Sequence, residues 1–207
     1  FSVLGFDSYP AEIRGFGRCV TRSRIGSQDI LAMGKETHVL ISLNEAEARS
    51  RIQFLAPKAV VIFENNPPTY IRQEASFVAD LPPDKLLFGM PLSDLATKAA
   101  GTQRGRNLTA LGAFAAICGV NPSLFVSVIE RKFKTKGENT LQANLKSFEY
   151  GYEYALKAFS EKREEVVQFR ELSHGDRKVM LSGNQAIGQA ALDAGVKLYF
   201  GYPITPA

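Results

Sequence analysis

The sequence predicts an α/β protein with a mostly parallel sheet that is covered by helices on both faces. Short apolar runs at residues 38–43, 59–63 and 85–89 carry this prediction. An amphipathic stretch separates the first two runs, so the order strand, helix, strand is expected. Strands that are apolar on both faces are typical of parallel sheets, because helices cover both sides of such sheets.

Two further strands are expected near the start of the chain. The first spans residues 1–6, and the second is the alternating stretch RCVTRSRI at residues 18–25. Side chains in a strand alternate between its two faces. One face of the second strand would carry Arg18, Val20, Arg22 and Arg24.

Four helices are expected, at about 44–55, 107–118, 121–133 and 139–159. Asn44 and Asn121 are suitable N-cap residues, and Pro122 suits the first helical position. In the last and longest helix, apolar residues recur every three or four positions and therefore line one face. Gly151 lies inside that helix, where a glycine is tolerated at a cost of about 1 kcal/mol.

A domain boundary is expected after these helices. Residues 161–177 are charged and lack an apolar pattern, so they read as a solvated helix end and linker. A βαβ unit is predicted to follow, with strands at 178–181 and 197–200 and a helix at 185–194. Its right-handed crossover would bring the loops after both strands to one edge of the sheet, where ligands of open α/β sheets bind.

The loop after the second of these strands reads GYPITPA, at residues 201–207. Pro203 and Pro206 each fix their own φ and hold Tyr202 and Thr205 in extended conformations. A hydroxyl held in this way loses little entropy on binding, so Thr205 is a candidate binding residue. A plain exit turn is the alternative, because loops at strand ends are only candidate sites.

Composition excludes several classes of protein. The chain has 207 residues, of which 45% are hydrophobic and 22% charged, as in an ordinary globular protein. The longest apolar run, residues 108–120, is too short to span a bilayer, and no signal peptide is recognised, so a cytoplasmic protein is expected. The two cysteines and two histidines show no metal-type spacing, and an iron–sulfur cluster needs about four thiolates.

The formal net charge of +4 comes largely from four arginines near the start, Arg14, Arg18, Arg22 and Arg24. Such a cluster suits a phosphate-bearing ligand, an acidic protein face or a nucleic acid. Nucleic acid is the weakest of the three, because the basic strand has no interleaved aromatic residues for stacking. Arg14 with the glycines after it could hold an anion, although a glycine-rich surface turn explains them equally well.

Four stretches resemble the 2-oxoacid:ferredoxin oxidoreductases. Residues 182–207, SGNQAIGQAALDAGVKLYFGYPITPA, resemble the opening of the pyrimidine-binding domain of these enzymes. Residues 9–26, 37–43 and 104–133 resemble their γ domain. The order γ domain, linker, pyrimidine-binding domain is similar to the fused α subunit of the two-subunit, 2-oxoglutarate-type enzymes.

The resemblance implies three regions in this chain. Residues 1–160 would be a γ domain without its first, glycine-rich strand–turn–helix, residues 161–177 a linker, and residues 178–207 the truncated start of a pyrimidine-binding domain. The family oxidatively decarboxylates a 2-oxoacid to an acyl-CoA and passes the electrons to ferredoxin. The fused order favours 2-oxoglutarate, and pyruvate and branched-chain acids stay open.

The resemblance also implies site residues. Thr205 matches the loop threonine that meets the substrate carboxylate near the thiazolium ring, and Tyr202, Pro203 and Ile204 match the wall of that loop. Arg14 would contact a coenzyme A phosphate or a subunit interface. The family's Arg-Gly-Gly is Arg14-Gly15-Phe16 here, so a phenylalanine stands in place of the second glycine. No catalytic residue and no metal ligand is expected within this chain.

Cofactors and partners follow from the same resemblance. The complete complex would use thiamine diphosphate, Mg²⁺, an iron–sulfur cluster and coenzyme A, held mostly by a β subunit or by regions outside this chain. Ferredoxin and a 2-oxoacid would be the other partners, in an (αβ)2 hetero-oligomer without nucleic acid or membrane. The alternative is a non-catalytic interaction module, in which the γ domain assembles the α and β subunits.

Overall fold

The computed structural model describes residues 1–8, 19–66, 77–169 and 179–201. These residues fall into two compact units. The small unit comprises residues 1–8, 19–33 and 179–201, and the large unit comprises residues 34–66 and 77–169. Each unit is described by itself below.

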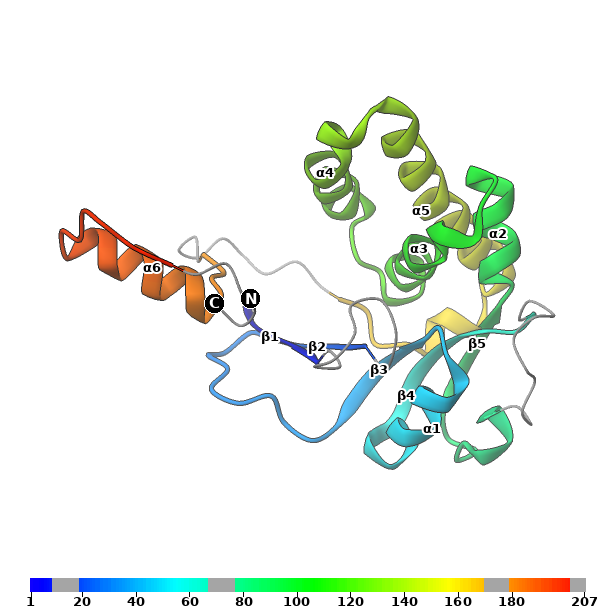
Figure 1. Ribbon diagram of the computed structural model, residues 1–207. Coiled ribbons are helices and arrows are strands. Elements are labelled where there is room, and N and C mark those ends of the chain that lie inside the picture. Colours follow the sequence, from blue (N-terminus) through cyan, green and yellow to red (C-terminus); the bar gives the residue numbers. More distant parts are fainter. Residues whose placement is uncertain (9–18, 67–76, 170–178, 202–207) are drawn as a thin grey trace. The chain divides into compact units, whose positions relative to one another are not determined.

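A three-stranded parallel sheet forms the centre of the large unit (Figure 1). Its strands are β3 (Thr37–Ser42), β4 (Leu55–Glu64) and β5 (Leu86–Met90), in the order β3-β4-β5. The three apolar runs of the sequence thus form the sheet, and the predicted α/β class with parallel strands is confirmed.

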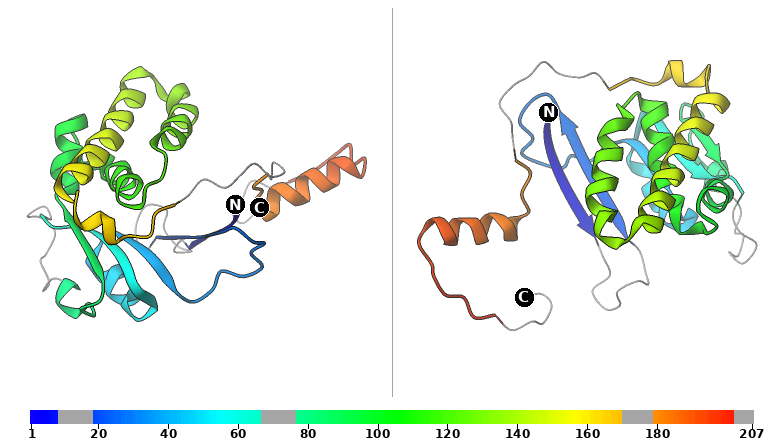
Figure 2. Two further views of the ribbon diagram at one scale, coloured as in Figure 1. Left: turned by 180° about the vertical axis from the view of Figure 1, so that it is seen from behind. Right: turned by 90° about the horizontal axis from the view of Figure 1, so that it is seen from above.

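Helices pack on both faces of this sheet, as Figures 1 and 2 show. They are α1 (Glu45–Arg51) on one face, and α2 (Leu92–Ala100), α3 (Arg106–Cys118) and α5 (Glu138–Ala158) on the other. Helix α4 (Pro122–Phe133) packs on α3 and α5. Side chains of β4 alternate between the two faces. Val60 and Ile62 join the core formed with α2, α3 and α5. Val61 joins a second core with Ala48 of α1 and with Phe77.

Most of the predicted helices are present. Asn121 caps α4, because its side-chain oxygen accepts a hydrogen bond from the Ser123 backbone N–H at 3.0 Å, and Pro122 follows at the first helical position. The predicted first helix is shorter, since α1 ends at Arg51 and a 3-10 turn leads into β4 at Leu55. Helix α2 was not predicted. It begins directly after β5, and its buried residues Leu92, Leu95 and Ala96 have the three- and four-residue spacing of an amphipathic helix, a signal that sequence reasoning missed.

Two glycines allow α3 and α5 to cross closely. A methyl group at Gly112 would overlap the Phe148 carbonyl oxygen, and one at Gly151 would overlap the Thr109 carbonyl oxygen. The sequence presented Gly151 only as a weak point of a long helix. The structure shows a different reason for it, because any side chain there would push the two helix backbones apart.

Residues 162–169, predicted to belong to a solvated linker, instead pack on the large unit. Val166 is only 6% exposed and joins the main core. The Gln168 side-chain amide donates to the Ile117 carbonyl at 3.0 Å, and the Phe169 backbone N–H donates to the Cys118 carbonyl at 2.8 Å. These bonds satisfy carbonyl groups that the end of a helix leaves without partners. The charged composition of this segment gave no sign of these hydrogen bonds, because they involve only one amide side chain and backbone groups.

The small unit contains an antiparallel pair of strands, β1 (Ser2–Ser8) and β2 (Val20–Gly26). Both strands were predicted, and they form a two-stranded sheet of their own. In the register of this pair, Arg22 lies opposite Phe6 and Arg24 lies opposite Leu4.

The small unit also contains helix α6 (Gly183–Asp193), which confirms the helix predicted at 185–194. The strands predicted at 178–181 and 197–200 are wrong for the residues that the structure describes, 179–181 and 197–200, because none of them forms a ladder. Their side chains are exposed, from 53% at Leu181 to 90% at Phe200. An apolar run becomes a strand only where a neighbouring strand satisfies its backbone groups, and no described residue does so here.

Candidate functional site

The sequence-predicted site residues lie outside the described residues. This holds for Tyr202, Pro203, Ile204 and Thr205 of the last loop and for Arg14. Their roles stay predictions.

The other loop of the predicted ligand edge, at residues 182–185, is described. The Ser182 hydroxyl accepts a hydrogen bond from the Gln185 backbone N–H at 3.2 Å, and the Gln185 side-chain oxygen accepts one from the Ser182 backbone N–H at 2.8 Å. This reciprocal pair is a capping box, which satisfies orphan donors at the start of a helix. The polar side chains of this loop therefore start α6.

Two of the four arginines expected to meet an anion are described, Arg22 and Arg24 of β2. Arg24 donates from Nη1 to the Ala32 carbonyl at 2.7 Å, so part of its hydrogen-bonding capacity is used within the chain. Arg18 lies outside the described residues. The predicted partner of the arginine cluster therefore stays a prediction.

The carboxyl edge of the parallel sheet is where ligands of open α/β sheets bind. Here Glu64, the last residue of β4, occupies it. Its Oε2 accepts a hydrogen bond from the Ser93 backbone N–H in the first turn of α2 at 2.7 Å, and its Oε1 accepts one from the Asn66 backbone N–H at 3.1 Å. A carboxylate at a helix N-terminus is favoured by the helix dipole.

The neighbouring side chains extend this arrangement. The Asn66 amide donates to the Asp94 carboxylate at 2.7 Å, and the Asn65 backbone N–H donates to the Met90 carbonyl at 2.9 Å. The Glu64 carboxylate thus places a negative charge from the same chain at the N-terminus of α2. Sequence reasoning missed Glu64, although an acidic residue directly after an apolar strand is a detectable signal.

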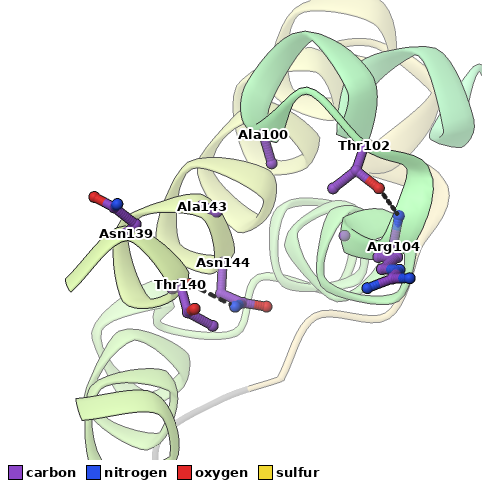
Figure 3. Close-up of a pocket in the computed structure, with 8 residues that line it drawn as sticks. Ala100, Thr102, Arg104, Asn139, Thr140, Ala143 and Asn144 are labelled. Carbon is purple, nitrogen blue, oxygen red and sulfur yellow. Dashed lines mark hydrogen bonds between the residues drawn. The ribbon is translucent and has the colours of Figure 1, made fainter. Parts of the chain in front are cut away.

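A surface pocket lies in the large unit between the α2–α3 connection and the start of α5 (Figure 3). Its volume is about 310 Å³. It is lined by Ala100, Thr102, Arg104, Gly105, Asn139, Thr140, Ala143 and Asn144. The Thr102 hydroxyl accepts a hydrogen bond from the Arg104 backbone N–H at 3.4 Å, and Asn144 donates to the Thr140 carbonyl at 2.7 Å. Sequence patterns gave no sign of this pocket, because its walls lie far apart along the chain.

The cysteines of this chain do not fit an iron–sulfur cluster. Cys118 is buried in α3, and burial raises the pKa of its thiol to about 12, whereas Cys19 is exposed. A cluster needs about four thiolates, and the sequence contains two cysteines. Across the described ranges, no group of three His, Cys, Asp or Glu side chains is placed to hold a metal ion.

None of the helices in the described parts of the chain has the length and apolar character needed to cross a membrane.

Three solved structures resemble the fold. A 2-oxoglutarate:ferredoxin oxidoreductase from Magnetococcus marinus, solved with 2-oxoglutarate, coenzyme A and succinyl-CoA bound, matches 99% of this chain with a TM-score of 0.70 and 23% identity. A keto/oxoacid ferredoxin oxidoreductase γ subunit from Geobacter sulfurreducens matches 75% of the chain and 80% of its own length, with a TM-score of 0.52 and 21% identity. A pyruvate oxidoreductase subunit from Thermotoga maritima matches 73% of the chain and 78% of its own length, with a TM-score of 0.50 and 18% identity.

The present chain spans about a third, 34%, of the Magnetococcus protein that it matches. Among curated proteins there is no significant match. A family profile described as pyruvate ferredoxin/flavodoxin oxidoreductase matches residues 1–154, which cover both strands of the small unit and nearly all of the large unit. The chain therefore belongs to the pyruvate ferredoxin/flavodoxin oxidoreductase family.

Proposed function

We propose that the chain is part of the α subunit of a 2-oxoacid:ferredoxin oxidoreductase, and that 2-oxoglutarate is its substrate. The complete enzyme would oxidatively decarboxylate the 2-oxoacid to an acyl-CoA and pass the electrons to ferredoxin. In this proposal, residues 1–160 are the γ domain, residues 161–177 the connection and residues 178–207 the start of the pyrimidine-binding domain.

This proposal rests on the share of the chain that each solved structure matches. The separate γ subunit from Geobacter matches 75% of the chain, and the Thermotoga subunit matches 73%. The Magnetococcus protein, whose printed name specifies 2-oxoglutarate, matches 99%. A γ domain followed by a further segment in one polypeptide is therefore the arrangement that the folds favour. The choice of 2-oxoglutarate rests on that arrangement.

The redox and metal cofactors of such an enzyme would come from elsewhere. Two cysteines, one of them buried with a raised thiol pKa, do not fit an iron–sulfur cluster. A partner β subunit would hold the cluster, the thiamine diphosphate and the Mg²⁺. The contribution proposed for this chain is to help assemble the complex and to bind substrate through its last loop.

In that loop, Thr205 would donate a hydrogen bond to the carboxylate of the 2-oxoacid, and Tyr202, Pro203 and Ile204 would form the wall beside it. A neutral donor suits this position, because a full positive charge would stabilise the carboxylate and oppose its loss as CO₂. A threonine hydroxyl supplies one donor without that charge. Arg14 would contact a coenzyme A phosphate or the subunit interface.

The test uses the complete complex, made by co-expressing the full-length polypeptide with a cluster-bearing β subunit. We expect viologen dye reduction that requires thiamine diphosphate, coenzyme A and a 2-oxoacid, with kcat/KM highest for 2-oxoglutarate among 2-oxoglutarate, pyruvate and a branched-chain 2-oxoacid. A preference for pyruvate would contradict 2-oxoglutarate as the substrate but would leave the proposed oxidative decarboxylation in place. If the complex assembles but reduces no dye with any 2-oxoacid, the proposed oxidoreductase activity is wrong.

A non-catalytic assembly module is the second candidate. Exposed apolar side chains in the small unit favour it, among them Phe6, Ile187, Leu198 and Phe200, which are 58%, 71%, 76% and 90% exposed. Surfaces of this kind mark protein interfaces. For this candidate, the chain should bind the β subunit in size-exclusion chromatography while the bound complex shows no 2-oxoacid-dependent dye reduction.

A further inference from the structure

The two edges of the parallel sheet in the large unit differ. The strand order β3-β4-β5 makes β3 and β5 the edge strands (Figure 1). At β5, the Lys162 ammonium donates to the Leu87 carbonyl at 2.7 Å and lies 5.4 Å from the centroid of the Phe88 ring. A lysine at the edge of a sheet discourages the addition of a further strand, because pairing would bury its charge. The chain therefore protects the edge at β5 with one of its own side chains.

The outer edge of β3 lacks such protection. β3 pairs with β4 along one side, and no described residue bonds to its backbone along the other. Its sequence, THVLIS, contains no lysine, arginine, carboxylate, proline or glycine. An edge of this kind presents a row of N–H and C=O groups with which another strand can pair.

The side chains of β3 are those of an interior strand. Val39 and Ile41 pack on the main core, and Leu40 packs on the second core. Strands that are apolar on both faces are typical of the interior of a parallel sheet. Residues 39–41 are nevertheless only partly buried, whereas residues 60–62 of β4, which has a neighbour on both sides, are at most 4% exposed. A further neighbour would complete the burial of β3.

Related proteins contain residues beyond the part that this chain matches. The matches cover 80% of the Geobacter γ subunit and 78% of the Thermotoga subunit, so about a fifth of each lies outside the match. A strand of five or six residues, the common length, needs far less than that. Proteins of this fold therefore have enough additional chain for one more strand.

We propose that the outer edge of β3 binds a further apolar strand, and that a segment preceding Phe1 in the full-length polypeptide supplies it. The family profile matches residues 1–154, so residues after Ala207 lie well outside that domain, and the strand is assigned to the other side. Apolar side chains on both faces of this strand would extend the two cores that β3 contacts. The proposal rests on the proposed function only in treating the chain as part of a longer polypeptide.

Hydrogen exchange of the 207-residue chain and of the full-length polypeptide tests this proposal. Successive N–H groups of a strand point to opposite sides, so about half of the amides of residues 38–42 should exchange rapidly in the 207-residue chain. In the full-length polypeptide, we expect these amides to exchange at least about a hundredfold more slowly, because they are paired. The rapidly exchanging amides of residues 86–90 in β5 are the internal control and should change by less than about threefold.

A full-length polypeptide shortened to begin at Phe1 is the matched control variant. The amides of residues 38–42 should exchange in it as they do in the 207-residue chain, while slow exchange at residues 60–62 of β4 shows that the sheet is intact. Protection of β3 that persists in this variant would overturn the proposed source of the strand. Equal slowing at β3 and β5 in the full-length polypeptide would indicate general stabilisation and reject the proposal.

Three further results would overturn the proposal. Slow exchange of every β3 amide in the monomeric 207-residue chain would show that the edge is already covered. Protection that appears only as the 207-residue chain dimerises would make a second copy the occupant. Protection that appears only when the β subunit binds would assign the strand to that partner. Exchange does not depend on enzyme activity, so an inactive complex with the expected protection of β3 would contradict the proposed function alone.

Discussion

Cys118 shows how burial changes the chemistry of a single side chain. The residue is 1% exposed in α3, and burial raises the pKa of its thiol to about 12. The thiolate is the reactive form of cysteine, so a thiol with this pKa is almost entirely unreactive at neutral pH. Cys19, just before β2, is exposed.

We therefore expect one fast-reacting thiol in the native chain. With a chromogenic disulfide reagent at pH 7.5, Cys19 should react at once and Cys118 only after urea unfolds the large unit. Cys19→Ser should abolish the fast phase, and Cys118→Ser should leave it unchanged. Two fast thiols in the native protein would contradict the buried position of Cys118.

Asp84 gives a second prediction for a single residue. The hydrogen bond from Lys85, whose Nζ lies 2.8 Å from both carboxylate oxygens, is the main factor that lowers the pKa of Asp84 below its usual value of 3.8. The Lys58 backbone N–H also donates to this carboxylate, at 3.3 Å. A lowered pKa in the folded state means that these bonds stabilise the fold above the unfolded pKa and are lost as pH falls through the folded value.

Asp84→Asn should therefore lower the free energy of unfolding at pH 7, and the difference from wild type should shrink at pH values below about 4. Urea unfolding followed by circular dichroism at a series of pH values measures this. Glu149→Gln, on an exposed part of α5, changes the charge equally and is the control. A difference for Asp84→Asn that stays constant down to pH 2 would rule out this role of the carboxylate.

At the scale of elements, the crossing of α3 and α5 depends on residues without side chains. Gly112 and Gly151 each lie against the backbone of the opposite helix, next to Phe148 and Thr109 respectively. The helices are thus close enough for one added methyl group to displace a backbone. Backbone atoms cannot move aside as the end of a flexible side chain can.

Gly151→Ala should destabilise the large unit by more than about 2 kcal/mol, because overpacking outweighs the gain of about 1 kcal/mol in helix propensity. Gly188→Ala is the matched control, since no atom lies within 4 Å of a methyl group at that position in α6. The control should leave stability unchanged or raise it by up to about 1 kcal/mol. Urea denaturation measures both variants, and equal effects would contradict the close crossing.

At the scale of the whole molecule, the role proposed for Thr205 can be tested in the complete complex. Loss of one hydrogen bond to a charged group costs about 1.5–3 kcal/mol, so Thr205→Ala should lower kcat/KM for the 2-oxoacid by about ten- to a hundredfold. Thr205→Ser keeps the hydroxyl and should retain most activity. Unchanged kinetics for the alanine variant, or an equal loss in both variants, would reject the role. A thermal melt of each variant checks that the complex remains folded.

The sequence by itself determined the features that depend on neighbouring residues. Apolar runs marked β3, β4 and β5, and the alternation of arginines marked β2. Asn121 with Pro122 marked the start of α4. Each of these signals lies within a few residues of the element it predicts, so they could be read without knowledge of the fold.

Only the tertiary structure decided features that join distant parts of the chain. The Glu64 carboxylate meets the Ser93 N–H 29 residues later, and the Gln168 amide meets the Ile117 carbonyl 51 residues earlier. Gly151 packs against Thr109, and the pocket forms between residues 100–105 and 139–144. The exposed apolar runs at 179–181 and 197–200 were predicted to be strands, but they form none because no described strand pairs with them. Periodicity reports which face of a segment is apolar, whereas packing and backbone pairing depend on what lies opposite that face.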